Sequence, residues 1–140
     1  MIYQMFAMVV LTFSVLILLF RGRVRAVRER RASLDYFKIY QGGTEPESTA
    51  KLARHFANLF EAPTLFYVVC LAAMITGFTG LTMQVFAWLY VAARLAHATI
   101  HLGGNRIRHR VRAYFLSWLV LLAMWLMLVI GIALRHSSLV

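Results

Sequence analysis

Residues 113–134 read AYFLSWLVLLAMWLMLVIGIAL and contain no charged side chain. A helix needs about 20 mainly apolar residues to cross a hydrocarbon core roughly 30 Å thick, so this stretch is long enough to span a membrane. Three more apolar stretches occupy residues 2–20, 59–75 and 81–102. The sequence therefore predicts an all-α fold, a transmembrane four-helix bundle.

The overall composition supports this class. Hydrophobic residues make up 61% of the 140 residues and charged residues only 14%, which is too apolar for a soluble domain of this size. We expect one membrane domain over 1–140, with helices at about 2–28, 49–76, 81–102 and 108–135. Arg21 follows the first stretch where a cleaved signal peptide would have small residues, so we expect that stretch to be retained. The single Cys70 excludes an intrachain disulfide.

The distribution of positive charge predicts the topology. Of the fifteen Lys and Arg residues, nine fall within residues 21–54 and four within 106–112. The positive-inside rule places these two segments in the cytoplasm and both termini on the opposite side. The net charge of +10 therefore indicates contact with membrane lipid headgroups, and we expect no nucleic-acid partner.

The second and third predicted helices each carry a polar face inside an apolar stretch. The residues concerned are Arg54, Asn58, Glu61, Arg94, His97, His101 and Asn105. Within each helix they are three or four residues apart, which places them on one side of that helix. Ionisable groups at membrane depth are costly and usually face a partner or a water-filled cavity. Two such faces predict a shared polar interior.

A charge count for that interior favours an anionic ligand. Glu61 and Arg94 lie at similar depths, roughly 10 and 13 Å from the cytoplasmic helix ends, so we predict an ion pair between them. Several donors then remain near the cytoplasmic rim: Arg25, Arg54, Asn58, His97, His101 and Arg110. Such a pocket suits an anion. The alternative is that the polar face only fixes the register between helices.

Other chemistries find less support. His97 and His101 are four residues apart, as in some metal sites, but His55 and His109 are assigned to cytoplasmic segments and do not complete a ligand set. We therefore predict no metal site. Glu61 is the only carboxylate within an apolar stretch, which excludes a paired-carboxylate mechanism there.

These polar residues form recognisable motifs. They are Arg54-x3-Asn58-x2-Glu61-Ala62-Pro63, Arg94-Leu95-Ala96-His97-x3-His101-Leu102-Gly103 and Arg110-x3-Tyr114. With them, the chain resembles the MAPEG family, membrane-associated proteins in eicosanoid and glutathione metabolism, over nearly its whole length. The chain resembles bacterial-type members of the family, which implies a location in the bacterial inner membrane. The resemblance also implies that four-helix protomers assemble as a homotrimer.

The resemblance also implies a site. Glutathione would bind between neighbouring subunits near the cytoplasmic surface, and Arg110 would contact its thiol and favour the thiolate. The implied glutathione-binding residues are Arg25, Arg54, Asn58, Glu61, Arg94, His97, His101 and Tyr114. The expected function is that of a glutathione-dependent membrane transferase or peroxidase that acts on hydrophobic electrophiles, with self, lipids and a hydrophobic substrate as partners.

The motifs also depart from some family members. Ala57 stands where several animal members have a second arginine, and His101 where they commonly have tyrosine. Val111 follows Arg110 where prostaglandin-forming members have serine, so we expect no prostaglandin synthesis. The alternative function is a non-catalytic membrane scaffold or lipid-binding subunit. A small transporter is disfavoured because the four stretches show no inverted repeat.

Overall fold

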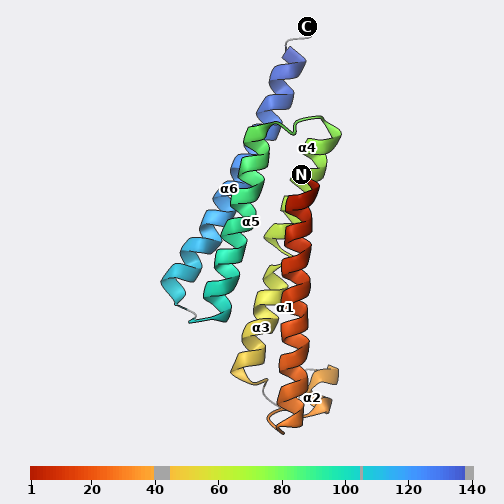
Figure 1. The fold of residues 1–140 in the computed structure, drawn as a ribbon, viewed down its shortest axis with the longest axis vertical. Helices are drawn as coiled ribbons and strands as arrows, with labels where there is room; N and C mark the ends of the chain where they lie inside the picture. Colours follow the sequence, from red (N-terminus) through yellow and green to blue (C-terminus); the bar gives the residue numbers. More distant parts are fainter. Residues whose placement is uncertain (40–44, 105, 138–140) are drawn as a thin grey trace.

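The computed structural model describes residues 1–39, 45–104 and 106–137. Within these residues the chain is all-helical and contains no strand. The helices, shown in Figure 1, are α1 (Ile2–Arg28), α2 (Leu34–Ile39), α3 (Glu47–Asn58), α4 (Ala62–Ile75), α5 (Leu81–Leu102) and α6 (Ile107–Ser137). Asn105, predicted to extend the polar face of α5, lies outside the described residues.

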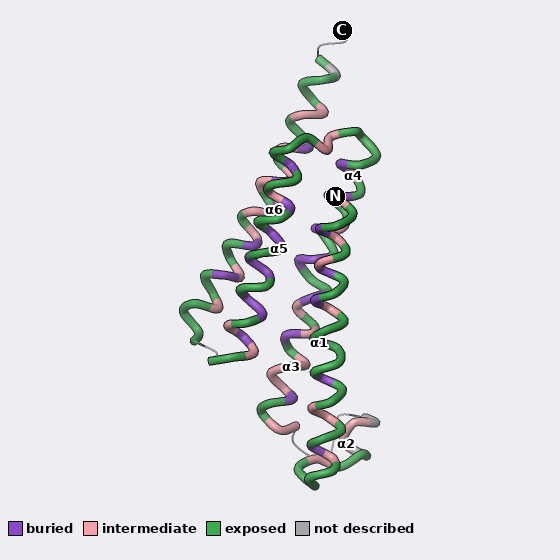
Figure 2. The backbone as a smooth tube through the Cα atoms, in the orientation of Figure 1, coloured by how far each residue is buried: buried purple, intermediate pink, exposed green. Residues whose placement is uncertain are grey.

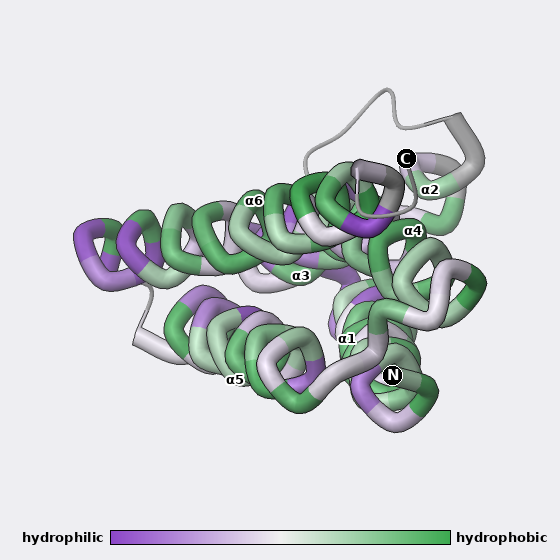
Figure 3. Tube along the Cα trace, turned by 90° about the horizontal axis from the view of Figure 1, so that it is seen from above, coloured by the Kyte–Doolittle hydropathy of each residue, from purple (hydrophilic) through white to green (hydrophobic). Residues whose placement is uncertain are grey.

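Four segments are long and apolar enough to cross a membrane. They are Ile2–Arg28, Glu47–Ile75, Leu81–Leu102 and Ile107–Arg135. The all-α prediction with four spans is therefore confirmed. Figure 1 shows the end of α1 and the start of α6 toward the same end of the molecule, and these carry the two basic segments. Figure 3 shows hydrophilic turns at both ends of α6 and mainly hydrophobic turns between them.

The second span was expected as a helix over about 49–76 that runs through Pro63, with a kink there or accommodation by neighbouring helices. In the structure it is interrupted just before that proline. Helix α3 ends at Asn58, and α4 begins at Ala62 after Glu61 adopts φ −89° and ψ −97°. Pro63 lies in the first turn of α4, where its missing N–H costs no helical hydrogen bond. In a continuous helix the same ring would clash with the preceding turn, so the chain breaks just before the proline.

Helices α1 and α3, which carry most of the first basic segment, pack closely against each other. Helix α3 packs along α1, and α5 packs mainly against α6. A Cβ atom added at Gly22 of α1 would lie 3.2 Å from Cγ2 of Thr49 and 3.4 Å from Cδ1 of Leu52. The glycine therefore lets α3 approach α1 closely, as small residues do between membrane helices.

The centre of the bundle is filled by large apolar and aromatic side chains. The rings of Phe66 and Tyr90 stack with centroids 4.3 Å apart, and Met8, Val15 and Met124 are buried around the same core. Figure 2 shows buried segments along the middle of the helices. Lipid tails are as apolar as these side chains, so van der Waals packing rather than exclusion from water holds the spans together.

The short helix α2 was not predicted. Its start is capped by Ser33, whose Oγ accepts a hydrogen bond from the backbone N–H of Tyr36 at 3.0 Å. Arg23 of α1 lies over the ring of Phe37, with its guanidinium carbon 5.2 Å from the centroid, and its Nε pairs with Oε1 of Glu45 at 3.3 Å. These contacts attach α2 and the segment before α3 to the end of α1.

Candidate functional site

A groove of about 650 Å³ opens between α3, α5 and α6 toward the basic end of the molecule. We call it the polar groove. It brings together most of the predicted site residues: Arg54, Asn58, His97, His101, Arg110 and Tyr114. The first two come from α3, the two histidines from α5, and the last two from the first turns of α6. Side chains far apart in the sequence thus meet in one cavity.

The rest of the polar groove is apolar. Ala57 of α3 and Ile107, Val111 and Phe115 of α6 complete its lining. The three positions noted above as departures from the resemblance, Ala57, His101 and Val111, therefore all line the groove itself. The cavity combines guanidinium and imidazole groups with an apolar wall.

Arg94 is fully buried beside the polar groove but does not line it. Asn58 is the last residue of α3, and its backbone oxygen accepts a hydrogen bond from Nη2 of Arg94 at 2.9 Å. The final carbonyls of a helix have no partner within that helix, and a cation there also interacts favourably with the helix dipole. Arg94 therefore caps α3 at the interruption. Its Nε and Nη1 have no hydrogen-bond partner among the described residues.

Glu61 does not form the predicted ion pair with Arg94. It is exposed, precedes α4, and is absent from the lining of the polar groove. The prediction assumed that Asn58 and Glu61 share one helical face, but the interruption between them ends the 3.6-residue periodicity. The backbone carbonyl of Asn58 occupies the position expected for the carboxylate.

Three buried imidazole rings form a cluster at the wall of the polar groove, where His97 and His101 line the groove and His55 lies behind them. The ring centroid of His55 lies 5.5 Å from that of His97 and 5.0 Å from that of His101, and the latter two are 5.7 Å apart. His55 was not grouped with the α5 histidines from the sequence, but the structure places its ring beside both of theirs. Both its ring nitrogens lack a hydrogen-bond partner among the described residues. Among all the residues that the structure describes, no three His, Cys, Asp or Glu side chains are arranged to hold a metal ion.

His55 is a buried neighbour of the site that sequence reasoning missed. A usable signal was present, because His55 and Asn58 are three residues apart and so lie on neighbouring positions of the α3 surface. Hydropathy placed the residue outside the lipid, and the packing of α3 against α5 then covers it.

His97 links α5 to the first turn of α6. Its Nδ1 lies 3.2 Å from the backbone oxygen of Arg110, a hydrogen bond in which Nδ1 donates. The His97 ring centroid is also 5.6 Å from that of Tyr114. These contacts fix the backbone that carries Arg110 at one side of the polar groove.

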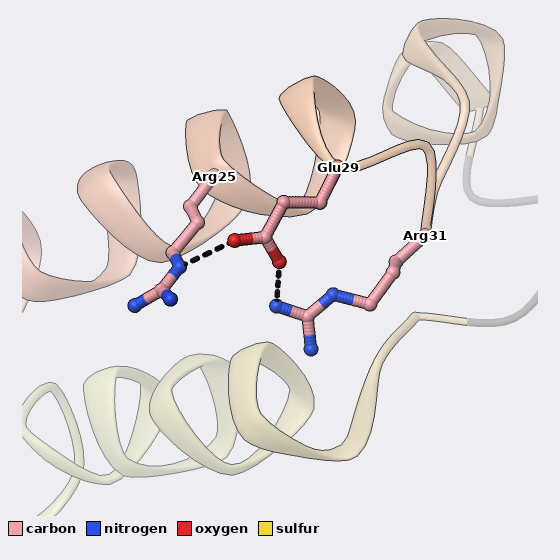
Figure 4. A network of polar contacts seen from close by, with 3 residues as sticks. All are labelled: Arg25, Glu29 and Arg31. Carbon is pink, nitrogen blue, oxygen red and sulfur yellow. Dashed lines mark hydrogen bonds and ion pairs between the residues drawn. The ribbon is translucent and has the colours of Figure 1, made fainter.

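Arg25 lies elsewhere within a single protomer. It is exposed on α1, and its Nε pairs with Oε1 of Glu29 at 2.7 Å, while Arg31 contacts the other carboxylate oxygen (Figure 4). Hydrogen bonds from Arg25 and then Arg31 lower the pKa of Glu29. Arg25 lines a separate cavity of about 570 Å³ on α1.

The polar groove has the chemistry of an anion site with an apolar neighbour. Arg54 and Arg110 supply guanidinium groups, which bind carboxylates through paired hydrogen bonds. The wall that includes Val111 and Phe115 suits an apolar molecule. Such a site can hold a charged and a hydrophobic reactant together.

Comparison with known proteins places the chain in a family. A search of curated proteins found no match. The family model described as the MAPEG family matches residues 1–130, which include the first three spans and most of the fourth. Because the match covers well over half of the sequence, the chain belongs to the MAPEG family, whose members are membrane proteins and include glutathione transferases.

Proposed function

We propose that this protein is a glutathione-dependent membrane transferase or peroxidase that acts on hydrophobic electrophiles. The observation that carries the proposal is the polar groove, in which Arg54, His97 and Arg110 from three helices line one cavity. The family includes glutathione-using members, which supports the choice of glutathione as the thiol in this proposal.

The groups in the polar groove fit parts of glutathione. The tripeptide carries two carboxylates, one ammonium and a thiol. Arg54 can bind a carboxylate, and Asn58 and Tyr114 offer further hydrogen-bonding groups. Arg110 on α6 faces the same groove and would stabilise the thiolate. A nearby cation lowers the pKa of a thiol and so favours its deprotonated form.

The proposed reaction uses both halves of the groove. The thiol proton passes to water, and the thiolate attacks an electrophilic carbon held against Val111 and Phe115. The new S–C bond forms as the leaving group departs with its electron pair. With a hydroperoxide, two glutathione molecules yield the disulfide, an alcohol and water.

The assembly we propose is a homotrimer. The residues that line the polar groove of one chain include no carboxylate to pair with the glutathione ammonium. Glu61 and Arg25 are exposed outside that groove. A neighbouring protomer in a trimer would bring these two side chains to the groove, so that each site is formed by two chains.

The orientation we propose places the polar groove at the cytoplasmic surface of a bacterial inner membrane, with both termini on the other side. The basic segments around Arg28 and Arg108 support this, because positive charge is retained on the cytoplasmic side. Both segments lie toward the same end of the molecule in Figure 1.

Calorimetric titration of glutathione into the detergent-purified protein tests the enzyme proposal. We expect binding to the wild type and a roughly 10- to 100-fold weaker affinity for Arg110→Ala, which removes a charged hydrogen-bond donor. Arg112→Ala is the matched control, because Arg112 is exposed on the same helix and does not line the groove. Absence of glutathione binding to the wild type would refute the proposal.

Mixed assemblies test the trimer separately. Glu61→Gln and Arg110→Ala are each expected to lower thiol conjugation to a chlorodinitrobenzene. If the two side chains reach one site from different protomers, coexpression restores part of the activity, because some sites then receive neither substitution. Activity of the mixture that equals the mean of the two variants would contradict a site shared between chains.

One observation favours the alternative of a non-catalytic scaffold or lipid-binding subunit. Arg94 is engaged with the end of α3, so part of the polar face has a structural role. This alternative predicts that Arg94→Leu alters assembly while the wild type shows no thiol-dependent turnover. Measured turnover with glutathione would exclude it.

A further inference from the structure

We propose that a second groove, at the opposite end of α5 and α6, binds an anionic phospholipid. One acyl chain lies in the groove, and the phosphate lies against Arg135. We call this the apolar groove. It is separate from the polar groove, and the inference does not depend on the proposed glutathione chemistry.

The apolar groove has the size and surface of a ligand site. Its volume is about 850 Å³, within the roughly 300–1,000 Å³ typical of ligand pockets. The side chains that line it are mainly aliphatic, aromatic or thioether groups, among them Met83, Phe86, Leu126, Met127 and Ile130. These surfaces suit a hydrocarbon chain and offer few hydrogen bonds to a polar ligand.

One end of the groove is shaped by a close contact between a loop and α6. The ring of Phe78 lies so near Gly131 that a Cβ atom at this glycine would overlap the ring. Phe78 follows Gly77, whose φ of +67° lets the chain turn back after α4. Phe78 and Gly131 both line the apolar groove, so this packing fixes its wall.

The cation at this end is held in position. Nη1 of Arg135 donates a hydrogen bond to the backbone oxygen of Thr76 at 3.1 Å, and the guanidinium carbon is 5.5 Å from the centroid of the Phe78 ring. Arg135 is itself exposed and lines the groove. A guanidinium group carries five N–H donors and binds phosphate well, so an exposed arginine at this position can contact a phosphate group.

The charge pattern selects an anion. Residues 1–20, 55–93 and 113–140 contain no other Lys or Arg. Arg135 is therefore the only Lys or Arg in the sequence segments that form this end of the bundle. In a phospholipid, a charged phosphate lies next to the apolar acyl chains. The groove has the matching arrangement, with a cation at its end in the headgroup region and an apolar surface beyond it.

A second copy of the chain fits this groove less well. Apart from Glu61, the acidic side chains all lie between residues 29 and 47, toward the other end of α1. A copy in the same membrane orientation would present apolar helix surface to the groove but no acidic side chain to Arg135. An anionic lipid supplies both the chain and the charge.

Photolabelling in vesicles tests the inference. The purified wild-type protein is reconstituted with phosphatidylglycerol that carries a diazirine in its acyl chain, and labelled peptides are mapped by mass spectrometry. We expect labels on Leu126 and Met127, and competition by unlabelled phosphatidylglycerol but not by phosphatidylcholine. Labelling of exposed apolar residues on α1, such as Phe13, gives the internal reference for non-specific lipid contact.

Three variants separate charge from shape. Arg135→Gln is expected to reduce groove labelling about fivefold relative to α1, the effect of about one cation near anionic lipid, whereas Arg135→Lys retains labelling. Ala123→Trp narrows the groove and reduces labelling with the charge intact. Arg112→Gln, at the other end of α6, leaves labelling unchanged. Groove labelling equal to that of α1, or crosslinks to a second copy in its place, would overturn the inference.

Discussion

The two ends of the α5–α6 pair use the same helices for opposite purposes. At the basic end, α3 joins them to form the polar groove around His97 and Arg110. At the other end, the loop after α4 joins them to form the apolar groove, with Arg135 as its cation. The same helix pair thus forms two different sites, each completed by a different third segment that packs against it.

Burial determines what each arginine does in these two regions. Arg94 is fully buried and caps the end of α3, whereas Arg135 is exposed and donates a hydrogen bond to the backbone oxygen of Thr76. A buried charge must be paired within the protein, and removal of its partner is costly. An exposed cation is in contact with the surroundings and can be reached by a ligand.

The largest expected effect is on ligand binding at the polar groove. Arg54→Gln should weaken glutathione affinity about 10- to 100-fold, because a charge-assisted hydrogen bond to a carboxylate is lost. Titration calorimetry measures the change. Lys51→Gln is the control, since Lys51 lies one turn earlier on α3 and does not line the groove. Phosphatidylglycerol labelling of the apolar groove should stay constant; a parallel loss would show that the two grooves are not independent.

The next effect is on stability. Arg94→Met should lower the free energy of unfolding by about 1–3 kcal/mol, because the Asn58 carbonyl loses its buried partner. Arg135→Gln should change it by less than about 0.5 kcal/mol, as is usual for an exposed site. Unfolding of the reconstituted protein by a denaturing detergent gives both values. Equal losses for the two variants would remove the contrast between the buried and the exposed arginine.

A smaller effect is expected within the imidazole cluster. His55→Phe removes two buried nitrogens that have no hydrogen-bond partner, so stability should stay the same or rise by up to about 1 kcal/mol. His97→Phe should instead lose about 0.5–1.5 kcal/mol with its bond to the Arg110 carbonyl. The same unfolding assay ranks the pair. A larger loss from His55→Phe would mean that His55 has a partner in the assembled protein.

The smallest effect concerns the exposed Glu29 network. Because Arg25 and Arg31 lower the pKa of Glu29 from its ordinary value of 4.5, the network stabilises the fold above that pH and loses this contribution as pH falls through the folded-state pKa. The difference in Tm between wild type and Glu29→Gln should therefore be small at pH 7 and shrink in acid. About 1 M salt should also reduce it, since charges are then screened within roughly 3 Å. A salt-independent difference would point to packing instead.

The four spans could be predicted from sequence because a membrane crossing imposes length and apolar composition directly. Periodicity also identified residues that meet in the polar groove when they belong to one helix, as His97 and His101 do on α5. Arg54 and Asn58 likewise share α3. Local geometry within one continuous helix is fixed by the chain itself.

The remaining features depended on information that periodicity does not contain. Glu61 was misplaced because the helix stops before it, and His55 because packing against α5 buries a residue that hydropathy assigns to water. Arg25 could not be placed relative to Arg110, since they belong to helices α1 and α6 that no spacing rule connects. Contacts between helices, and still more between subunits, are set by packing.

The interruption before Pro63 divides the second span into two helices, and the direction in which the side chains of one helix point does not fix that of the other. In an unbroken helix, any change that turns the ligand-facing side of α3 would turn the core-facing side of α4 by the same angle. Here residues 59–61 are not helical, so the two faces are not tied to one helical repeat, and Arg94 bonds the carbonyl that the break leaves open. Related chains can therefore diversify the surface around Arg54 while the packing of Phe66 against its neighbours is preserved.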